Sequence, residues 1–351
     1  MKVAIIGAGL VGRILALSCF QRIPDIKIKL FDRAENLQTH LGCGAFSAGM
    51  VAPFSEFDIN YPELSQLGQE SLILWPQLMK ILPSPQKIFN QNGTLIVAHH
   101  HDATDFQQLE QRITKNFLPT QACLLDHQTL KALEPELNQQ KFYQKSLQLP
   151  YEANINVPKF YAETTNFFLH SKQFIYQQRN IDNVNLNLPE LKNVDYIFDT
   201  RGLGAKQYFT NLHGVRGEAL LVRAKDVKLQ HTIRLIHPRH KIYIVPRGAG
   251  LYYIGATIIH GEDNSAISVK SMLDLTSALY TVHPGFLEAR ILKTFAQSRP
   301  TLLKATPTTK RENNIIYLNG FHRHGHLLGP TICHKIINNI INKEHHDKNY
   351  A

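Results

Sequence analysis

The sequence predicts an α/β fold with two parts: a doubly wound nucleotide-binding domain assembled from separated segments, and a second domain built on a mainly antiparallel sheet. Three observations predict this fold. The chain begins with a short apolar strand, a glycine-rich turn and a helical stretch. Further strand-like runs occur at 174–200 and 314–318. In the middle, long alternating runs such as EALLVRA and KIYIVPR, separated by turn residues, indicate antiparallel strands.

The first element of this fold is a strand, turn and helix at the N-terminus. The apolar run Lys2–Ile6 leads into the turn GAGLVG, and residues 13–22 follow at helical spacing. In a GxGxxG turn of this kind, Gly7 allows the tight bend, Gly9 lets the backbone approach a pyrophosphate, and Gly12 lets the helix pack on the strand. The amides at the start of the helix attract phosphates. The segment therefore predicts a Rossmann-like dinucleotide site.

The second strand of the domain ends in a carboxylate. The alternating run IKIKLFD ends at Asp32, which is followed by Arg33. A carboxylate at this place accepts hydrogen bonds from both hydroxyls of an adenosine ribose, and it repels a 2′-phosphate. NAD and FAD both fit these residues.

Composition and length limit the function classes. A chain of 351 residues is long enough for two domains, and no apolar run approaches the 18 or so residues of a membrane span. The net charge of +10 suits an anionic ligand, but the basic residues are scattered, so we expect no nucleic-acid partner. The 4 cysteines lie far apart, which favours free thiols in the cytoplasm. Homo-oligomerisation and membrane docking of the basic C-terminal helix stay open.

Two histidine-rich stretches raise the question of a metal. Histidines on the strand end HHHD, residues 99–102, would point in alternating directions, which predicts a polar strand end or turn. The stretch NGFHRHGHLLGP, residues 319–330, has no carboxylate nearby in sequence, and its glycines suit a backbone that approaches a flat ring. We therefore expect no metal ligands in the chain.

A run of small residues provides the first family resemblance. The segment GCGAFSAGMVAP, residues 42–53, leaves no room for bulky side chains up to Gly49-Met50. It resembles the segment that follows the ribose carboxylate in the glycine oxidase and D-amino-acid oxidase family of FAD-dependent enzymes. Five further segments are similar to that family in the same order, at 195–206, 214–224, 242–257, 299–301 and 319–330.

The resemblance implies non-covalent FAD and a division of the chain. The FAD-binding domain would comprise 1–85, 145–212 and 300–351, and the substrate domain 86–144 and 213–299. No flavin attachment motif is recognised, although Cys43 and Cys333 leave this point open. The residues expected to contact FAD are Gly7, Ala8, Gly9, Leu10, Val11, Gly12, Asp32, Arg33, Gly44, Ser47, Ala48, Gly49, Met50, Ile181, Gly202, Arg323, His324, Gly325, His326 and Leu327.

The resemblance also implies roles in catalysis. Arg299 would bind the substrate carboxylate, since a guanidinium matches a carboxylate and stays charged when buried. Tyr243 would steady the same carboxylate, Ile258 would line the side-chain pocket, and Arg323 would lie in the wall over the flavin. The helix after Gly325 would direct its positive dipole at the flavin N1 and C2 oxygen, which favours hydride transfer.

The expected reaction is oxidative deamination of a small amino acid or secondary amine, such as glycine, sarcosine or a D-amino acid. Hydride would pass from Cα to flavin N5, the imine would hydrolyse, and oxygen would accept the electrons to give hydrogen peroxide. A D-amino-acid dehydrogenase that passes electrons to a quinone or another carrier is one alternative, and a non-enzymatic flavoprotein partner is another. In this chain His322, His324 and His326 replace an aromatic, an asparagine and an aliphatic residue of the family pattern, which leaves the substrate open.

Overall fold

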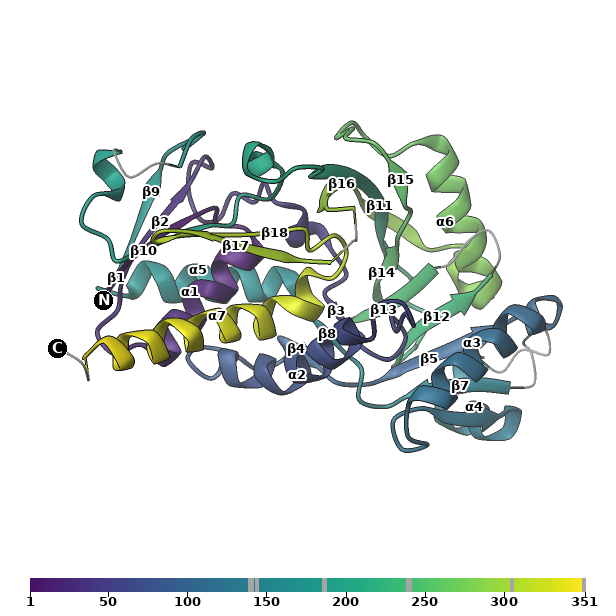
Figure 1. Cartoon of the computed structure of the whole chain (residues 1–351). Coiled ribbons are helices and arrows are strands. Elements are labelled where there is room, and N and C mark those ends of the chain that lie inside the picture. The colour runs from purple at the N-terminus through teal and green to yellow at the C-terminus, as the bar shows by residue number, and fades with distance from the viewer. Residues whose placement is uncertain (138–141, 143–144, 185–187, 238–241, 304–305, 349–351) are drawn as a thin grey trace.

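A computed structural model describes residues 1–348 except 138–141, 143–144, 185–187, 238–241 and 304–305. The described chain forms two lobes that lie side by side, and both termini are at the far end of the first lobe (Figure 1). The first lobe contains a six-stranded sheet, and the second contains a nine-stranded sheet. Among the described residues, no helix combines the length and the apolar character needed to cross a bilayer.

The six-stranded sheet is the nucleotide-binding sheet that the sequence predicts. Its strand order is β17-β18-β10-β1-β2-β9, and all neighbours are parallel except β17 with β18. Val3 to Ile6 are at most 1% exposed, as expected for a strand covered on both faces. The strands are β1 (Lys2–Ile6), β2 (Lys27–Asp32), β9 (Phe174–Gln178), β10 (Tyr196–Asp199), β17 (Thr308–Glu312) and β18 (Ile315–Asn319).

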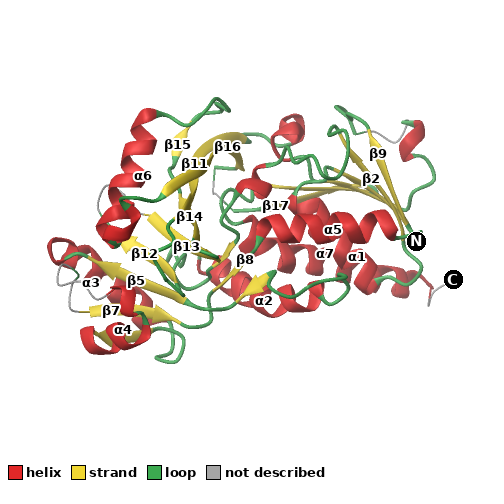
Figure 2. Ribbon diagram, turned by 180° about the vertical axis from the view of Figure 1, so that it is seen from behind, coloured by secondary structure: helices red, strands yellow, loops and turns green. Residues whose placement is uncertain are grey.

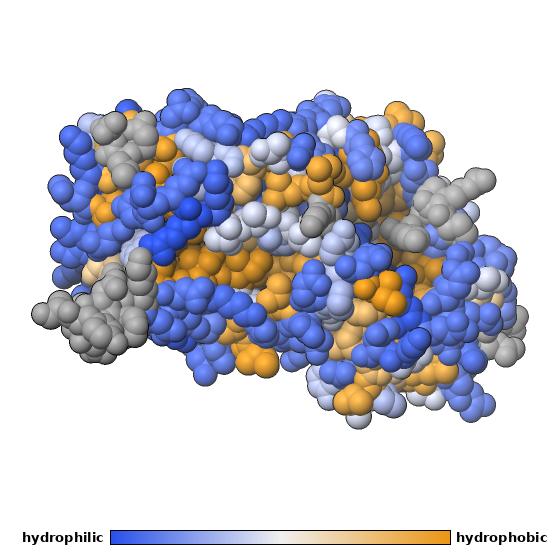
Figure 3. Space-filling model, viewed as in Figure 1, coloured by the Kyte–Doolittle hydropathy of each residue, from blue (hydrophilic) through white to orange (hydrophobic). Residues whose placement is uncertain are grey.

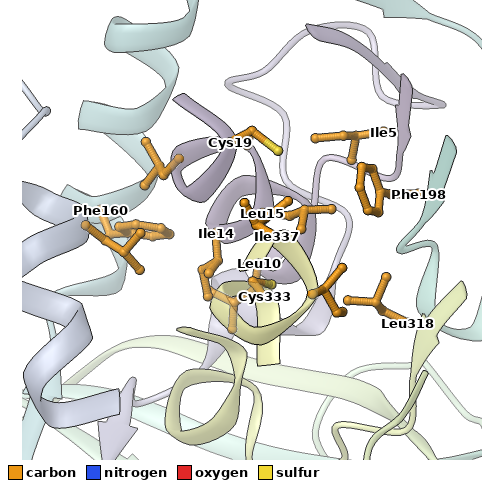
Figure 4. Close-up of a cluster of buried hydrophobic side chains, with 14 of the residues drawn as sticks. Ile5, Leu10, Ile14, Leu15, Cys19, Phe160, Phe198, Leu318, Cys333 and Ile337 are labelled. Carbon is orange, nitrogen blue, oxygen red and sulfur yellow. The ribbon is translucent and has the colours of Figure 1, made fainter. Parts of the chain in front are cut away.

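Four helices belong to this lobe: α1 (Leu10–Arg22), α2 (Pro62–Met79), α5 (Val157–His170) and α7 (Gly325–Lys348). Helices α1, α5 and α7 lie together on one side of the sheet in both views (Figures 1 and 2). Figure 4 shows the core between them, where Ile14 and Leu15 of α1 meet Ile337 of α7. Since α7 comes from the end of the chain, the domain is assembled from separated segments, as the sequence predicts.

The nine-stranded sheet is mainly antiparallel, as predicted. Its order is β15-β11-β14-β13-β12-β5-β7-β6, with β16 also paired to β11, and only β5 with β12 is parallel. The strands are β5 (Thr94–Ala98), β6 (Cys123–Asp126), β7 (Lys145–Leu149), β11 (His213–Arg223), β12 (Thr232–Ile236), β13 (Ile242–Gly248), β14 (Leu251–Gly255), β15 (Ile259–His260) and β16 (Arg290–Thr301).

Helices α3 (Ala103–Asn116), α4 (His127–Leu133) and α6 (Val269–Val282) belong to this second lobe. Helix α6 packs on the sheet through Leu275 and Leu279, and it ends before Pro284. A small third sheet joins β3 (Met50–Val51), β8 (Ala153–Ile155) and β4 (Phe89–Asn90). The short 3-10 helices are η1 (Cys43–Phe46), η2 (His100–Asp102), η3 (Pro135–Leu137), η4 (Pro189–Leu191), η5 (Gly202–Tyr208) and η6 (Pro284–Phe286).

Two details differ from the sequence-based expectations. Strand β7, at the start of the segment 145–212, pairs with β5 and β6 in the nine-stranded sheet, so this strand lies in the second lobe. The HHHD tract is a turn after β5, as expected, but side-chain alternation ends with β5 at Ala98 because residues 100–102 form η2. Hydrophilic residues cover most of the face seen in Figure 3, and hydrophobic ones show in a band across the first lobe.

Candidate flavin and substrate site

A cavity of about 680 Å³ is lined by residues of both large sheets. Every predicted cofactor residue lines this cavity except Ala8 and Gly12. The predicted substrate residues Arg299, Tyr243 and Ile258 line it as well. The cavity lining therefore combines the glycine turn and Asp32 of the first lobe with Arg299 of the second lobe.

The glycine turn between β1 and α1 has the predicted geometry. Gly7 has φ +106°, and an added Cβ would lie 2.9 Å from the carbonyl oxygen of Thr200. An added Cβ at Gly12 would lie 2.0 Å from the carbonyl oxygen of Gly7, so Gly12 permits the close packing of helix on turn. At Gly9 an added Cβ meets nothing within 4 Å. The backbone at Gly9 therefore faces open space, which fits a pyrophosphate.

Asp32 is held at the end of β2 beside this turn. Its Oδ2 accepts a hydrogen bond from the amide of Ala8 at 2.6 Å, and its Oδ1 accepts one from the amide of Ala34 at 2.9 Å. These bonds fix the carboxylate and leave further lone pairs for a ligand. The arrangement fits the predicted contact with ribose hydroxyls.

Arg13, which the sequence analysis did not select, supports the turn from behind. Its side chain is buried, and its Nε donates to the carbonyl of Ala8 at 3.0 Å. Its Nη1 donates to Thr164 and Thr165 of α5, and its Nη2 donates to the carbonyl of Leu37. Burial lowers the pKa of Arg13 to about 10. The only sequence signal is a charge in an otherwise apolar helix start.

The small-residue segment is fixed by a half-buried arginine, Arg247. Arg247 of β13 donates from Nη1 to Asn154 Oδ1 at 2.7 Å and from Nη2 to the carbonyl of Ala48. Gly49 has φ +64°, and an added Cβ would lie 2.4 Å from the carbonyl oxygen of Ile155. Arg247 therefore ties the segment before Met50 to both β8 and β13.

Arg201 anchors the loop of a predicted cofactor residue to the first sheet. Its guanidinium forms an ion pair with the buried carboxylate of Asp199 at 2.7 Å. Its Nη1 also donates to the carbonyls of Ile181 and Asp182. Arg201 therefore holds the loop of Ile181, a predicted cofactor contact, against the end of β10.

Arg299 lies over a glycine on the neighbouring strand. An added Cβ at Gly217 of β11 would lie 1.9 Å from Nη2 of Arg299, so the guanidinium occupies the space that a side chain would fill. Nη1 of Arg299 donates to the carbonyl of Thr257 at 3.2 Å. A glycine inside a strand often marks such a close approach, and this is the signal that could have identified Gly217.

The hydroxyl of Tyr243, on β13, lies close enough to Arg299 for the arginine's charge to act on it. Burial raises the pKa of the Tyr243 hydroxyl, and the positive charge of Arg299 opposes this shift. The hydroxyl therefore stays protonated and can donate a hydrogen bond to a bound anion.

A charged cluster that the sequence analysis missed surrounds Arg323. Nη2 of Arg323 lies 2.5 Å from Oε2 of Glu56, and Nη1 of Arg234 donates to Oε1 of Glu56 at 2.8 Å. Nε2 of His324 lies 3.5 Å from the same Oε2. Burial would raise the pKa of Glu56, but Arg323 and Arg234 hold it well below its usual value. The carboxylate of Glu56 therefore forms ion pairs with two guanidinium groups at the cavity wall.

Glu152 positions the chain just before Glu56. Its Oε1 accepts hydrogen bonds from the amides of Phe54 at 3.1 Å and Ser55 at 2.6 Å. The side chain is 0% exposed, and burial raises the pKa of Glu152 to about 7.

The three histidines of the terminal motif have three different partners. Nδ1 of His322 lies 2.8 Å from the hydroxyl of Thr301. His324 approaches Glu56, while Nδ1 of His326 lies 3.3 Å from the hydroxyl of Ser47. Burial lowers the pKa of both His322 and His326 to about 3. His322 and His326 are therefore neutral wall residues at pH 7, and each of the three histidines has a different partner.

The two cysteines considered for flavin attachment differ in position. Cys43 lines the cavity, and burial raises the pKa of its thiol. Cys333 lies in the core between α1 and α7, does not line the cavity, and also has a raised thiol pKa because of burial (Figure 4). Cys333 is therefore placed away from the cofactor space.

The fold and the site together define a dinucleotide-binding protein in which a second, mainly antiparallel lobe contributes to the same cavity. Residues 2–338 match the model of the FAD dependent oxidoreductase family, and the chain belongs to that family. It is an enzyme that uses FAD, as the sequence resemblance implied.

Known relatives agree with this assignment. The chain is 28% identical over 346 residues to the putative thiamine biosynthesis oxidoreductase ThiO of Rhizobium etli, covering 98% of each chain. Glycine oxidase from Geobacillus kaustophilus has a similar fold, with a TM-score of 0.80, 20% identity and coverage of 97% of this chain and 95% of that one. Iminodiacetate oxidase from Chelativorans sp. BNC1 has a TM-score of 0.78, 19% identity and coverage of 95% and 93%.

Proposed function

We propose that the protein catalyses oxidative deamination of a small amino acid or secondary amine, with oxygen as the electron acceptor. The observation that carries the proposal is the position of Arg299. Its guanidinium lies on Gly217 and lines the same cavity as the glycine turn and Asp32. A carboxylate bound there would be held within the space that FAD and substrate share.

The chain's own residues would bind and orient the substrate. Arg299 would form a bidentate pair with the carboxylate, and the protonated hydroxyl of Tyr243 would add a hydrogen bond. The apolar side chains of Phe46, Met50 and Ala256, which line the cavity, would exclude water from the reacting carbon. When bound, FAD supplies the two-electron acceptor for the Cα–H bond.

The electron and atom balance is simple. The amine loses a hydride from Cα and a proton from nitrogen to become an imine. Water then adds to the imine and releases a keto acid together with ammonia, or together with a primary amine when the substrate is a secondary amine. The two electrons and two protons convert oxygen to hydrogen peroxide, or pass to another carrier if the enzyme is a dehydrogenase.

One observation favours an acidic substrate as a second candidate. Burial raises the pKa of Tyr243, whereas the positive charges of Arg299, Arg323 and Arg234 lower it and the negative charge of Glu56 raises it, so positive charge is in excess around this hydroxyl. A substrate with two carboxylates, such as iminodiacetate or D-aspartate, would balance this excess of positive charge better than glycine would. A relative with a similar fold is named as an iminodiacetate oxidase.

The reaction is tested by product analysis in air. Purified holoenzyme is incubated with glycine, sarcosine, D-alanine, D-aspartate or iminodiacetate, and the amine product, keto acid and peroxide are quantified. We expect keto acid and peroxide in equal amounts. Product formation that requires an added dye and yields no peroxide would support the dehydrogenase and exclude oxygen as the acceptor. Absence of keto acid with every substrate would contradict the proposed reaction.

We further propose that the enzyme works in the cytoplasm. All four cysteines are free thiols, which supports a reducing compartment. Recovery of the protein in an oxidised, disulfide-bonded form from cells would contradict this location.

A further inference from the structure

The ends of two neighbouring strands bring His101, Asp102 and His237 together. Strands β5 and β12 are parallel, and Ala98 pairs with Ile236, so the residues that follow leave the same edge of the sheet. One ligand atom from each of the three side chains lies within 4.8 Å of the other two. None of the three lines the flavin cavity.

Asp102 is a buried carboxylate without a full set of partners. It is 3% exposed and stands at the N-cap of α3, yet its side chain makes no capping hydrogen bond. Among the described residues, its Oδ2 has no hydrogen-bond partner, and Nε2 of His101 lies 3.3 Å from it. A buried carboxylate oxygen in this state costs free energy unless a cation lies against it.

The imidazole of His237 faces the same place. The rings of His101 and His237 are 6.4 Å apart between centroids and nearly perpendicular at 87°. His237 therefore adds a nitrogen from a second strand to the nitrogen and oxygen that η2 provides.

We propose that His101, Asp102 and His237 bind a divalent zinc ion outside the flavin site. Two imidazole nitrogens and one carboxylate oxygen are zinc ligands at about 2.0 to 2.2 Å, which places such atoms roughly 3.3 Å apart in a tetrahedral site. The side chain of His101 is 71% exposed, so its ring can rotate to close the remaining distance. Water completes the coordination.

The chemistry of the donors selects the ion. Magnesium and calcium prefer sites made of oxygen atoms, whereas imidazole suits zinc and the neighbouring transition metals. The bound ion would join the start of α3 to the end of β12, so its expected effect is stabilisation of the second lobe. A simple ion pair of His101 with Asp102 is the competing account, and it does not involve His237.

The test uses untagged holoenzyme that has been treated with a chelator and dialysed. Zinc binding is measured by isothermal titration calorimetry on the wild type, His101→Ala, His237→Ala and the control His170→Ala, whose histidine is exposed at the end of α5. We expect one zinc per chain in the wild type and the control, and at least 10-fold weaker binding in the other two variants. Thermal unfolding of the wild type with added zinc should shift upward, while FAD content stays the same.

Two results would overturn the proposal. One is the absence of stoichiometric zinc binding by the wild type. The other is unchanged binding in His237→Ala, which would show that the ion is held elsewhere or that His101 and Asp102 form only an ion pair.

Discussion

The carboxylate of Glu56 lies 2.5 Å from the guanidinium of Arg323, and the same carboxylate accepts a hydrogen bond from Arg234. This relationship joins the loop after the small-residue segment to the terminal motif and to β12. A single carboxylate therefore orders two arginines at the wall of the cavity.

Replacement of Glu56 should disturb substrate binding more than FAD binding. In Glu56→Gln the two arginines lose their shared negative charge, so we expect kcat/KM to fall about 10-fold, with a lower Tm, because a half-buried carboxylate no longer pairs with two guanidinium groups. Steady-state kinetics and thermal unfolding measure both effects. Glu70→Gln, which removes an exposed partner of Lys335, is the control. Equal losses in the two variants would exclude a special role for Glu56.

Arg299→Lys should retain FAD and lose substrate affinity. Lysine cannot form the bidentate pair, so we expect KM to rise and kcat/KM to fall by about 100-fold. The visible spectrum checks the cofactor, and Arg290→Lys on the exposed end of the same strand is the control. An unchanged KM would mean that the carboxylate binds elsewhere.

A side chain at Gly217 should act through Arg299. In Gly217→Ala the new methyl group would occupy the position of the guanidinium, so we expect a loss of substrate affinity similar to that of Arg299→Lys. The double variant Gly217→Ala/Arg299→Lys should be little worse than either single variant, because both remove one interaction. Fully additive losses in kcat/KM would contradict this explanation.

The N-terminal motif was predictable because its evidence is local. Strand, turn, helix and Asp32 follow one another within the first residues of the chain, and each is recognised by residue type and spacing. Arg13, Arg247 and Glu56 escaped prediction because their partners come from distant segments, such as α5 for Arg13 and β8 for Arg247. The position of β7 was not predicted for the same reason, because the residues of β7 alone do not indicate that it pairs with β5.

Loss of the ribose carboxylate should weaken cofactor binding. In Asp32→Asn the amide is a poorer acceptor for ribose hydroxyls, so we expect the Kd for FAD to rise about 10-fold. Fluorescence titration of the apoprotein with FAD measures this change. Asp25→Asn, an exposed residue in the turn before β2, should bind FAD as the wild type does. If Asp32→Asn and the wild type bind FAD with the same Kd, Asp32 does not contribute to the cofactor site.

The neutral histidines predict a pH dependence of stability. The pKa of His322 is lowered to about 3 in the folded protein, below the ordinary value of 6.5. His322 therefore contributes its full share to the free energy of unfolding above pH 6.5. This contribution is lost as the pH falls from 6.5 toward 3, because the unfolded chain binds the proton at a higher pH than the folded protein does. His322→Asn should therefore show a flatter fall of Tm between pH 7 and pH 5 than the wild type or His170→Gln. Identical slopes would contradict this role.

Anaerobic reduction of the bound flavin tests the central claim most directly. Wild type and Arg299→Lys are mixed without oxygen with glycine, sarcosine, D-alanine, D-aspartate and iminodiacetate, and the visible absorption is followed. The account predicts that at least one of these amines bleaches the wild-type flavin, and that the variant needs about 100-fold more of the same amine. Flavin that stays oxidised with the whole panel, although dithionite reduces it, would contradict amine oxidation at this site.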